Sequence, residues 1–533
     1  MKKIFNYKLL TVFTVLLFSS ISCTKDFDEI NTNNNRPTYD QAAPEMLLTN
    51  CIEVLTDRVH EIFLGEEMGS CWVQQQAKVQ YTDEDRYRPR VSVINNTWAS
   101  FYASSGMDAE AMINISKARG ADYDNYQAAG IVLKCYVMSV LTDLFGDVPY
   151  TNAFKARPAD GGILTPTYDT QASIYADLIQ KLKDVNTLFD ADKDFQGDIL
   201  YNNDVDKWIK FANSLRIRLI MRQSDRVAPT AELTDMIVTH AADYPIFESN
   251  DDNAALAYLG SSPNNNPVHE NRKTRDDHRV SKTIIDYMWT PSLKDWRMCT
   301  YAVPAEKQND YVGLPNGLES AAAAAYLEGG LTHTSKLGTY FTAAEAPGQL
   351  MSYAELNFIL SEATFKGLIP GAPHTAQEYY EEGVAASFTQ FKDASTSRYS
   401  DYYVVNKVWN RYPDSQLNDW FGTITPTIDD LITDYLTNEQ GAWVGTLEQI
   451  LTQKWIAMFD QGLQSWFEWR RTGFPVLTPA ANAYNPYIPQ RVYYPSDEYS
   501  RNKANVTAAA NSQGLVGQSD LNTRVWWDIT DNH

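Results

Sequence analysis

Residues 124–150 read DNYQAAGIVLKCYVMSVLTDLFGDVPY, and this stretch decides the type of fold. Its apolar side chains recur at three- and four-residue steps, the period of an amphipathic helix: Ala128, Ile131, Cys135, Met138, Leu141 and Phe145. Gly146 and Pro149 follow and stop the helix, because glycine permits a left-handed turn and proline cannot continue the hydrogen-bond ladder. The stretch predicts a helix over residues 124–145 that ends in a sharp turn.

The same helical period returns along the chain. Three further stripes share it: Ile174, Leu178, Leu182, Val185 and Phe189; Trp208, Ala212, Leu215 and Leu219; Leu447, Leu451, Trp455 and Met458. Asp169 is the predicted N-cap of the first stripe, and Thr446 with Gln449 forms a predicted capping box before the third. Between about residues 244 and 349, Gly, Pro and Asn replace the stripes, as they also do over 391–427 and from 473 onward. A mostly helical chain with a loop-rich central insertion is predicted.

The N-terminal stretch has the layout of a secretory signal. Three lysines precede a ten-residue, largely apolar run from Leu9 to Phe18, which is too short to cross a bilayer as a stable helix. Ser20-Ile21-Ser22-Cys23 resembles a bacterial lipobox, although a leucine is usual where Ser20 stands. We expect residues 1–22 to be removed as a lipoprotein signal peptide, Cys23 to carry the lipid, and residues 23–38 to form a tether. The alternative is an ordinary signal with a chance cysteine.

Composition excludes some classes of partner. The formal net charge is −22, and removing residues 1–22, which carry three lysines and no acid or arginine, makes it −25. Nucleic acid is therefore not an expected partner, because phosphate binding needs a concentrated positive face. The cysteines beyond Cys23 have no zinc or redox spacing, and a Cys51–Cys71 disulfide is left open.

Catalytic motifs are missing from the sequence. It holds no nucleophile elbow, phosphate-binding loop or dinucleotide fingerprint, and its seven histidines do not form a zinc-binding pair. No metal and no cofactor are therefore expected. A carboxylate pair for glycoside hydrolysis stays open, because the separation of such a pair is set by the fold and not by the sequence.

Several blocks, taken in order, resemble one family. They are FDEINTNNNRPT (27–38), LTDLFGDVPYTNAF (141–154), GDILYNNDVDKWIKFANSLRIRLIMR (197–222), DYVGLPNGL (310–318), MSYAELNFILSEATFKGLIPG (351–371), EYYEEGVAASF (378–388), QKWIAMFDQGLQSWFEWRRTGFP (453–475) and RVYYPSDEYSRNKAN (491–505). Together they are similar to the SusD/RagB outer-membrane nutrient-binding lipoproteins, in their SusD-like branch.

The resemblance implies an all-α fold of tetratricopeptide-like helix pairs, with a loop-rich portion packed on one side, as a single domain over residues 39–533. It implies a non-enzymatic protein, anchored by lipid in the outer membrane and facing the cell exterior. Such a protein would capture glycan oligosaccharides, or in some members peptides, for a SusC-like TonB-dependent transporter. A surface-anchored glycoside hydrolase or peptidase, or a purely structural or adhesive protein, remains the alternative.

Two of these blocks have a physical interpretation of their own. Trp466 and Trp469 stand three residues apart and are expected in the core, whereas Arg470 and Arg471 are expected to pair with acids or cap carbonyl groups. Glu355 and Glu362 stand seven apart on one helical face, which indicates polar contacts between helices and not a catalytic pair.

Aromatic residues outside helical stripes are the candidates for ligand binding, because sugars stack their flat apolar faces on aromatic rings. The predicted ligand-binding residues lie in the loop-rich centre: Trp289, Trp296, Tyr301 and Tyr311, with Asp310 and Asn316 as polar partners. Core packing is the alternative for each of them. Trp72, Trp98, Trp409 and Trp420 are further candidates, with packing favoured for Trp98.

Overall fold

The computed structural model describes residues 39–390, 412–422, 426–437, 441–459 and 461–529. The chain divides into two compact units, Met1–Ala43 and Pro44–His533, and the second is described below. The predicted signal peptide, Cys23, the tether and Trp409 lie outside the described residues.

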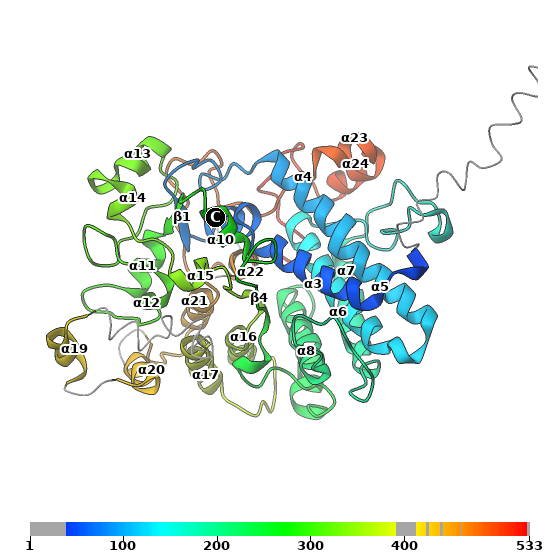
Figure 1. The fold of residues 1–533 in the computed structure, drawn as a ribbon, viewed down its shortest axis with the longest axis horizontal. Helices are drawn as coiled ribbons and strands as arrows, with labels where there is room; N and C mark the ends of the chain where they lie inside the picture. Colours follow the sequence, from blue (N-terminus) through cyan, green and yellow to red (C-terminus); the bar gives the residue numbers. More distant parts are fainter. Residues whose placement is uncertain (1–38, 391–411, 423–425, 438–440, 460, 530–533) are drawn as a thin grey trace, which may run out of the picture. The chain divides into compact units, whose positions relative to one another are not determined.

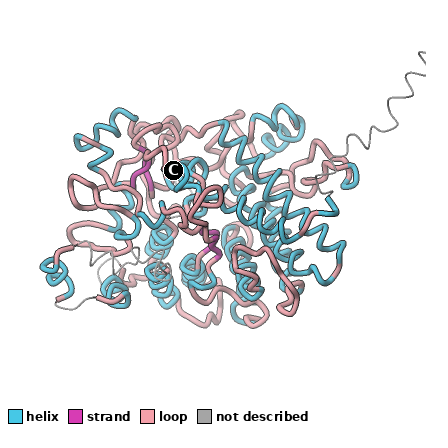
Figure 2. Tube along the Cα trace, viewed as in Figure 1, coloured by secondary structure: helices cyan, strands magenta, loops and turns pink. Residues whose placement is uncertain are grey.

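Helices dominate the second unit, as predicted (Figure 2). The longer ones are α3 (Pro44–His60), α4 (Val91–Ser100), α5 (Gly106–Arg119), α6 (Asp124–Phe145), α7 (Gln171–Asp184), α8 (Val205–Arg222), α16 (Tyr353–Phe365), α17 (Ala376–Thr389), α20 (Ile428–Thr437), α21 (Leu447–Ala457), α22 (Gly462–Thr472) and α24 (Lys503–Ser512). The shorter ones are α9 (Thr230–Thr234), α10 (Pro267–Arg272), α11 (Lys282–Met288), α12 (Met298–Tyr301), α13 (Ser320–Ala325), α14 (Gly330–His333), α15 (Thr339–Thr342), α19 (Asp414–Phe421) and α23 (Ser496–Arg501). The part of the chain that the structure describes also contains the π-helical segments η2 (Ile62–Ser70), η3 (Phe101–Ser105) and η7 (Asp235–Thr239).

Consecutive helices pack as pairs, α5 with α6, α7 with α8 and α16 with α17, which is the tetratricopeptide-like arrangement. In Figure 1 the long helices α3, α5, α6 and α7 lie on one side, the short helices α11 to α14 with their loops lie on the other, and α16 and α21 stand between them. The all-α prediction with a loop-rich portion on one side is therefore confirmed.

Helix α6 has the predicted bounds, Asp124–Phe145, and Gly146 ends it at φ 81°, a left-handed conformation that favours glycine. Among the described residues, the stretch Ala121–Phe145 is the one long and apolar enough to span a membrane by length and composition, but most of it is buried inside the protein. It is the central core helix.

The predicted cap of α7 is off by one residue. Thr170, and not Asp169, accepts the hydrogen bond from Ser173 N at the start of the helix. The carboxylate of Asp169 instead accepts hydrogen bonds from Tyr150 N (3.0 Å) and Thr151 N (2.8 Å), so it secures the turn that follows α6. At α21, Thr446 accepts from Gln449 N as predicted, but the capping box is only half formed, because the Gln449 side chain accepts from Val444 N and not from Thr446 N.

Two short ribbons interrupt the helices. Strands β1 (Gln76–Lys78) and β3 (His278–Val280) pair antiparallel, with Lys78 opposite His278. Strands β2 (Ala254–Leu256) and β4 (Gly348–Met351) form the second antiparallel pair. Strands β2 and β3 lie within the predicted insertion and β4 crosses its end, and the insertion is built of loops, short helices and short strands.

A glycine contact joins η2 to α22. A Cβ atom on Gly462 would lie 2.4 Å from Ser70 N, and one on Gly69 would lie 2.5 Å from Gly462 C. The two backbones can approach so closely only because neither position carries a side chain. This contact holds η2, and β1 just after it, against the helical frame.

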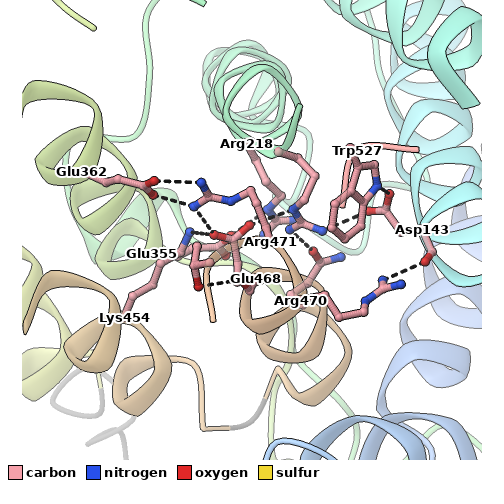
Figure 3. A network of polar contacts seen from close by, with 12 residues as sticks. Asp143, Arg218, Glu355, Glu362, Lys454, Glu468, Arg470, Arg471 and Trp527 are labelled. Atoms are coloured by element: carbon pink, nitrogen blue, oxygen red, sulfur yellow. Dashed lines mark hydrogen bonds and ion pairs between the residues drawn. The ribbon is translucent and has the colours of Figure 1, made fainter. Parts of the chain in front are cut away.

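Buried ion pairs connect helices that are distant in the sequence (Figure 3). Arg218 on α8 binds both oxygens of Glu355 on α16, at 2.7 and 2.6 Å, and Arg471 on α22 binds both oxygens of Glu362, at 2.7 and 2.5 Å. The structural interpretation of Glu355 and Glu362 is therefore confirmed.

The network continues through Glu468, which accepts from Lys454, Arg222 and Arg471 at 2.7 to 2.9 Å. Arg470 donates to the carbonyl oxygens of Gln490 and Asp143, both at 2.7 Å. Trp466 and Trp469 are fully buried, so the core interpretation of these residues is confirmed as well.

Cys51 and Cys71 are both buried and free, so the disulfide left open by the sequence is not formed. Cys51 Sγ instead donates to the Ser105 carbonyl at 3.2 Å. Burial raises the pKa of the Cys71 thiol well above its usual range, with the charge of Asp85 acting in the same direction.

Candidate functional site

Four of the six predicted ligand-binding residues come together in one aromatic cluster. Trp289 contacts Trp296 and Tyr311 edge to face, with ring centroids 5.6 and 4.9 Å apart, and its Nε1 donates to Asp310 Oδ1 at 3.0 Å. Trp296 is only 1% exposed, and Tyr412 and Trp420 lie against it. The half-buried rings of the cluster are those of Tyr412, Trp420 and Phe421. Ligand contact by the four predicted residues stays a prediction.

The other two predicted residues lie apart from this cluster. Tyr301 is buried, stacks on Phe459 with centroids 4.5 Å apart, and lines a cavity of about 40 Å³, which is room for a water molecule and not for a sugar. Asn316 donates to Gln76 O (2.7 Å) and Asp85 Oδ1 (2.6 Å), and its Oδ1 accepts from Ser281. Asn316 thus secures β1 in place.

A surface groove lies beside β1, near α13 and α14 at the upper left of Figure 1. It consists of two neighbouring hollows that share Tyr81, Arg275 and Asp277, and we call it the Tyr81 groove. Hollow A, of about 530 Å³, is lined by Gln80, Tyr81, Thr274, Arg275, Asp276, Asp277, Arg279, Glu306, Leu331, Thr332 and Lys336. Hollow B, of about 520 Å³, is lined by Ile62, Phe63, Glu67, Lys78, Tyr81, Thr82, Asp83, Glu84, Arg90, Asn271, Arg275, Asp277, His278 and Ser320.

Tyr81 is the prominent aromatic residue of the groove. Its side chain is 61% exposed, and its φ of 52° is a left-handed conformation that is costly for a residue other than glycine. The Arg275 guanidinium carbon lies 4.8 Å from the ring centroid, and Arg275 also pairs with Asp277 at 3.5 Å. An exposed ring kept in a strained backbone position is a feature found at binding sites.

Four charged side chains close a ring in the floor of hollow B. Lys78 binds Oε1 of Glu67 and contacts Oε2 of Glu84 at 3.4 Å. Arg90 binds the other two oxygens, Oε2 of Glu67 and, at 2.5 Å, Oε1 of Glu84. Burial raises the pKa of Glu67 to about 7, although Lys78 opposes the shift. Both carboxylates thus have each oxygen bound to a cation.

Next to this ring lie polar atoms without a hydrogen bond to any described residue. His278, directly opposite Lys78 in the ribbon, is buried, and its Nε2 is such an atom. Glu66 Oε2 is another, 3.8 Å from His278 Nδ1. Burial lowers the pKa of His278 well below its usual range, with Lys78 acting in the same direction, so its ring is neutral at pH 7. Of these two residues, His278 lines hollow B, and its Nε2 is a position where a ligand hydroxyl or a water gains a hydrogen bond.

The charges of hollow A also pair among themselves. The pairs are Arg275–Asp277 (3.5 Å), Arg279–Asp276 (3.1 Å), Lys336–Asp276 (3.2 Å) and Lys336–Glu306 (3.6 Å). The three cations thus face three acids, and neither hollow has a large surplus of charge. Among the described residues, no group of three or more His, Cys, Asp or Glu side chains could hold a metal ion.

Sequence reasoning missed this groove. Tyr81 lies in the stretch VQQQAKVQYTDEDRY, where Trp72 was the candidate, but Trp72 is fully buried. The only signal in this stretch was that Tyr81 lies among polar side chains and belongs to no apolar helical stripe. Its partners Arg275 and Lys336 are brought near only by the fold.

The fold is that of a helical protein, and the Tyr81 groove, as a candidate site, suits an uncharged, hydroxyl-rich ligand with a flat apolar face. Residues 34–495 match the model of a SusD-like family described as "Starch-binding associating with outer membrane". The chain belongs to this SusD-like family.

Solved structures carry the same fold. A chitin-binding protein is 26% identical, covers 92% of this chain and 100% of its own, and superposes with a TM-score of 0.72. A SusD homolog from Bacteroides uniformis is 24% identical over 91% of this chain and 99% of its own, with a TM-score of 0.69. A chitin-binding SusD homolog from Flavobacterium johnsoniae is 22% identical over 92% of this chain and 98% of its own, with a TM-score of 0.68. No curated protein sequence matches the chain.

Proposed function

We propose that this protein is a non-catalytic capture lipoprotein that binds neutral glycan oligosaccharides in the Tyr81 groove. The observation that carries the proposal is the exposed Tyr81 ring between two hollows whose charges are already paired, in a chain of a starch-binding family. An oligosaccharide across the groove would stack one unit on Tyr81 and place its neighbours in hollows A and B, within reach of many donors and acceptors.

The charge ring in hollow B supports binding over cleavage. A glycoside hydrolase needs one carboxyl group that carries a proton and can reach the glycosidic oxygen. The pKa of Glu67, about 7, would suit such an acid, but Lys78 and Arg90 bind both of its oxygens and both oxygens of Glu84. Neither side chain has a free oxygen for the substrate.

The ligand class follows from the charges and from the relatives. Fully paired charges leave no partner for a uronic acid, a sulfate or the termini of a peptide, so an uncharged ligand suits the groove. The description of the family model names starch binding, and two of the similar structures are of chitin-binding proteins. Oligomers of glucose and of N-acetylglucosamine are therefore the first ligands to test, and peptides are the alternative.

The remaining parts of the proposal concern location and partner. Residues 1–22 would be the signal peptide, Cys23 the lipid anchor, 23–38 the tether and 39–533 the binding domain. The protein would face the cell exterior and deliver its ligand to a SusC-like TonB-dependent transporter. Support comes from the lipobox-like stretch before Cys23 and from a family associated with the outer membrane.

Calorimetric titration of residues 24–533 with maltooligosaccharides, chitooligosaccharides and peptides tests the proposal. We expect binding of one sugar series, no shortened products on chromatography, and a loss of affinity of roughly tenfold or more in Tyr81→Ala, as for a central aromatic contact. Tyr487→Ala, which removes another exposed tyrosine outside the groove, is the matched control. Shortened products, binding of peptides alone, or equal affinity in Tyr81→Ala and Tyr487→Ala would contradict the proposal.

A further inference from the structure

A separate hollow of about 810 Å³ lies between α16, α17 and the segment that follows α9. We call it the α17 groove. It shares no lining residue with the Tyr81 groove and is lined by Met236, Ile237, Ala241, Ala242, Tyr244, Pro245, Ile246, Phe247, Glu248, Tyr353, Asn357, Leu360, Pro373, His374, Glu378, Tyr379, Glu381, Glu382, Ala385 and Leu436.

The floor of the α17 groove is apolar. Phe247, Leu360 and Tyr379 are buried at its base, and Ile246 and Leu436 stay half-buried. Ile246 and Leu436 keep part of their apolar surface in water, and this water is released when an apolar ligand covers them, which is favourable in proportion to the area covered. The floor therefore suits a partner with apolar side chains.

The rim of the groove is acidic. Glu381 and Glu382 follow Glu378 by three and four residues, so both lie beside it on α17, and Glu248 also lines the groove, from the segment that follows α9. No lysine or arginine is among the described residues that line the groove. Glu248 pairs with Lys210 at 2.6 Å, whereas none of the three glutamates of α17 forms a salt bridge with a described residue. Like charges three and four residues apart repel, and a cation placed between them relieves the repulsion.

We propose that the α17 groove docks a basic amphipathic segment of a partner protein. Its apolar side chains would cover the floor, and its lysines or arginines would pair with Glu381 and Glu382. From Glu378 to Ala385 the wall follows about two turns of α17, or roughly 10 Å, the arrangement in which a helix lies in a groove. A small amine would leave most of this apolar length uncovered. The docking site is independent of the Tyr81 groove and its ligand.

The experiment uses a fluorescent synthetic helix with leucines at positions i, i+3, i+4 and i+7 and lysines elsewhere, titrated with residues 24–533 and followed by anisotropy. We expect saturable binding that weakens roughly three- to thirtyfold in the double variant Glu381→Gln/Glu382→Gln, since two surface charge contacts are lost. Binding of the helix to the unmodified protein should also weaken as the salt concentration rises from about 0.05 to about 0.5 M. Ile246→Gln, at the floor, should weaken it through the apolar contact.

Asp206→Asn/Asp225→Asn is the matched control, because it removes the same net charge from exposed positions outside the groove and should keep the affinity. Circular dichroism checks that each variant is folded. The proposal is overturned if the lysine helix does not bind, if the control loses as much affinity as the Glu381/Glu382 variant, if a glutamate version of the helix binds equally well, or if a short diamine displaces the helix.

Discussion

Glu362→Gln tests whether the buried ion pairs hold the helical frame together. In the native protein both oxygens of Glu362 accept from Arg471, at 2.7 and 2.5 Å, and both side chains are buried. The glutamine has a similar size and keeps one acceptor, so the change removes the charge while it leaves the packing. Arg471 then faces only Glu468 as a buried counter-charge, at 2.9 Å.

The pKa of Glu362 gives the size of the stability loss expected in Glu362→Gln. Burial alone would raise this pKa, but Arg471, helped by Lys366 at 2.8 Å from Oε1, outweighs burial and lowers it from 4.5 to about 2. At about 1.4 kcal/mol per pKa unit, the difference corresponds to about 3 kcal/mol of stability. Breaking a buried ion pair by removing one partner costs about 3–5 kcal/mol, which agrees. For a unit of roughly 500 residues, whose unfolding entropy is about 1 kcal/mol/K, the melting temperature should fall by about 3 °C.

The direction of the pKa shift sets the pH range in which Glu362 stabilises the folded protein. Because the folded pKa lies below the unfolded one, the contribution of Glu362 is complete above about pH 4.5 and is lost as the pH falls toward 2. Differential scanning calorimetry at several pH values should therefore show a gap between wild type and Glu362→Gln at pH 7 that narrows below pH 4.5. Glu448→Gln, an exposed position on neighbouring α21, is the control. An unchanged melting temperature at pH 7, or a gap of constant size down to pH 3, would refute the reasoning.

Three further predictions concern the anchor, the aromatic cluster and the glycine contact. Cys23→Ala should move the protein from the membrane fraction to the soluble fraction on cell fractionation, and retention in the membrane would exclude the lipid anchor at Cys23. Trp296→Ala should lower the free energy of unfolding by about 3–5 kcal/mol, because the ring is buried among other rings; unchanged oligosaccharide affinity by calorimetry would exclude ligand contact by Trp296, which lies outside the Tyr81 groove. Gly462→Ala should lower the melting temperature, because its Cβ would meet Ser70 N at 2.4 Å, and a melting temperature equal to wild type would contradict this close contact.

The local sequence pattern was sufficient to predict the helices and the structural roles of several charged residues. The bounds of α6 follow from its apolar period and from Gly146, because both act within one turn. Glu355 and Glu362 could be assigned to contacts between helices, since two acids on one buried face need cations. Their partners Arg218 and Arg471 could not be named, because each lies more than a hundred residues away.

The candidate site could not be predicted from the local sequence pattern, because its residues are also brought together from distant parts of the chain. Loop position does not distinguish an exposed tryptophan from a buried one, and Trp296 lies deep among aromatic residues although its neighbours in the sequence are irregular. The exposure of Tyr81 depends on its backbone conformation and on the pairing of β1 with β3, which brings residues 275–279 beside it.

The division between helical frame and groove also bears on how such proteins diversify. The charges of Figure 3 lie mostly in helices, whereas Arg275, Leu331 and Lys336, which line hollow A, lie outside the long helices. If the Tyr81 groove is the ligand site, as proposed, substitutions at these positions would change which ligand fits and would leave the buried ion pairs intact. The helical frame tolerates wide changes of sequence, since a solved structure superposes with a TM-score of 0.72 at only 26% identity, so under the proposed function the groove could be altered by selection without loss of the fold.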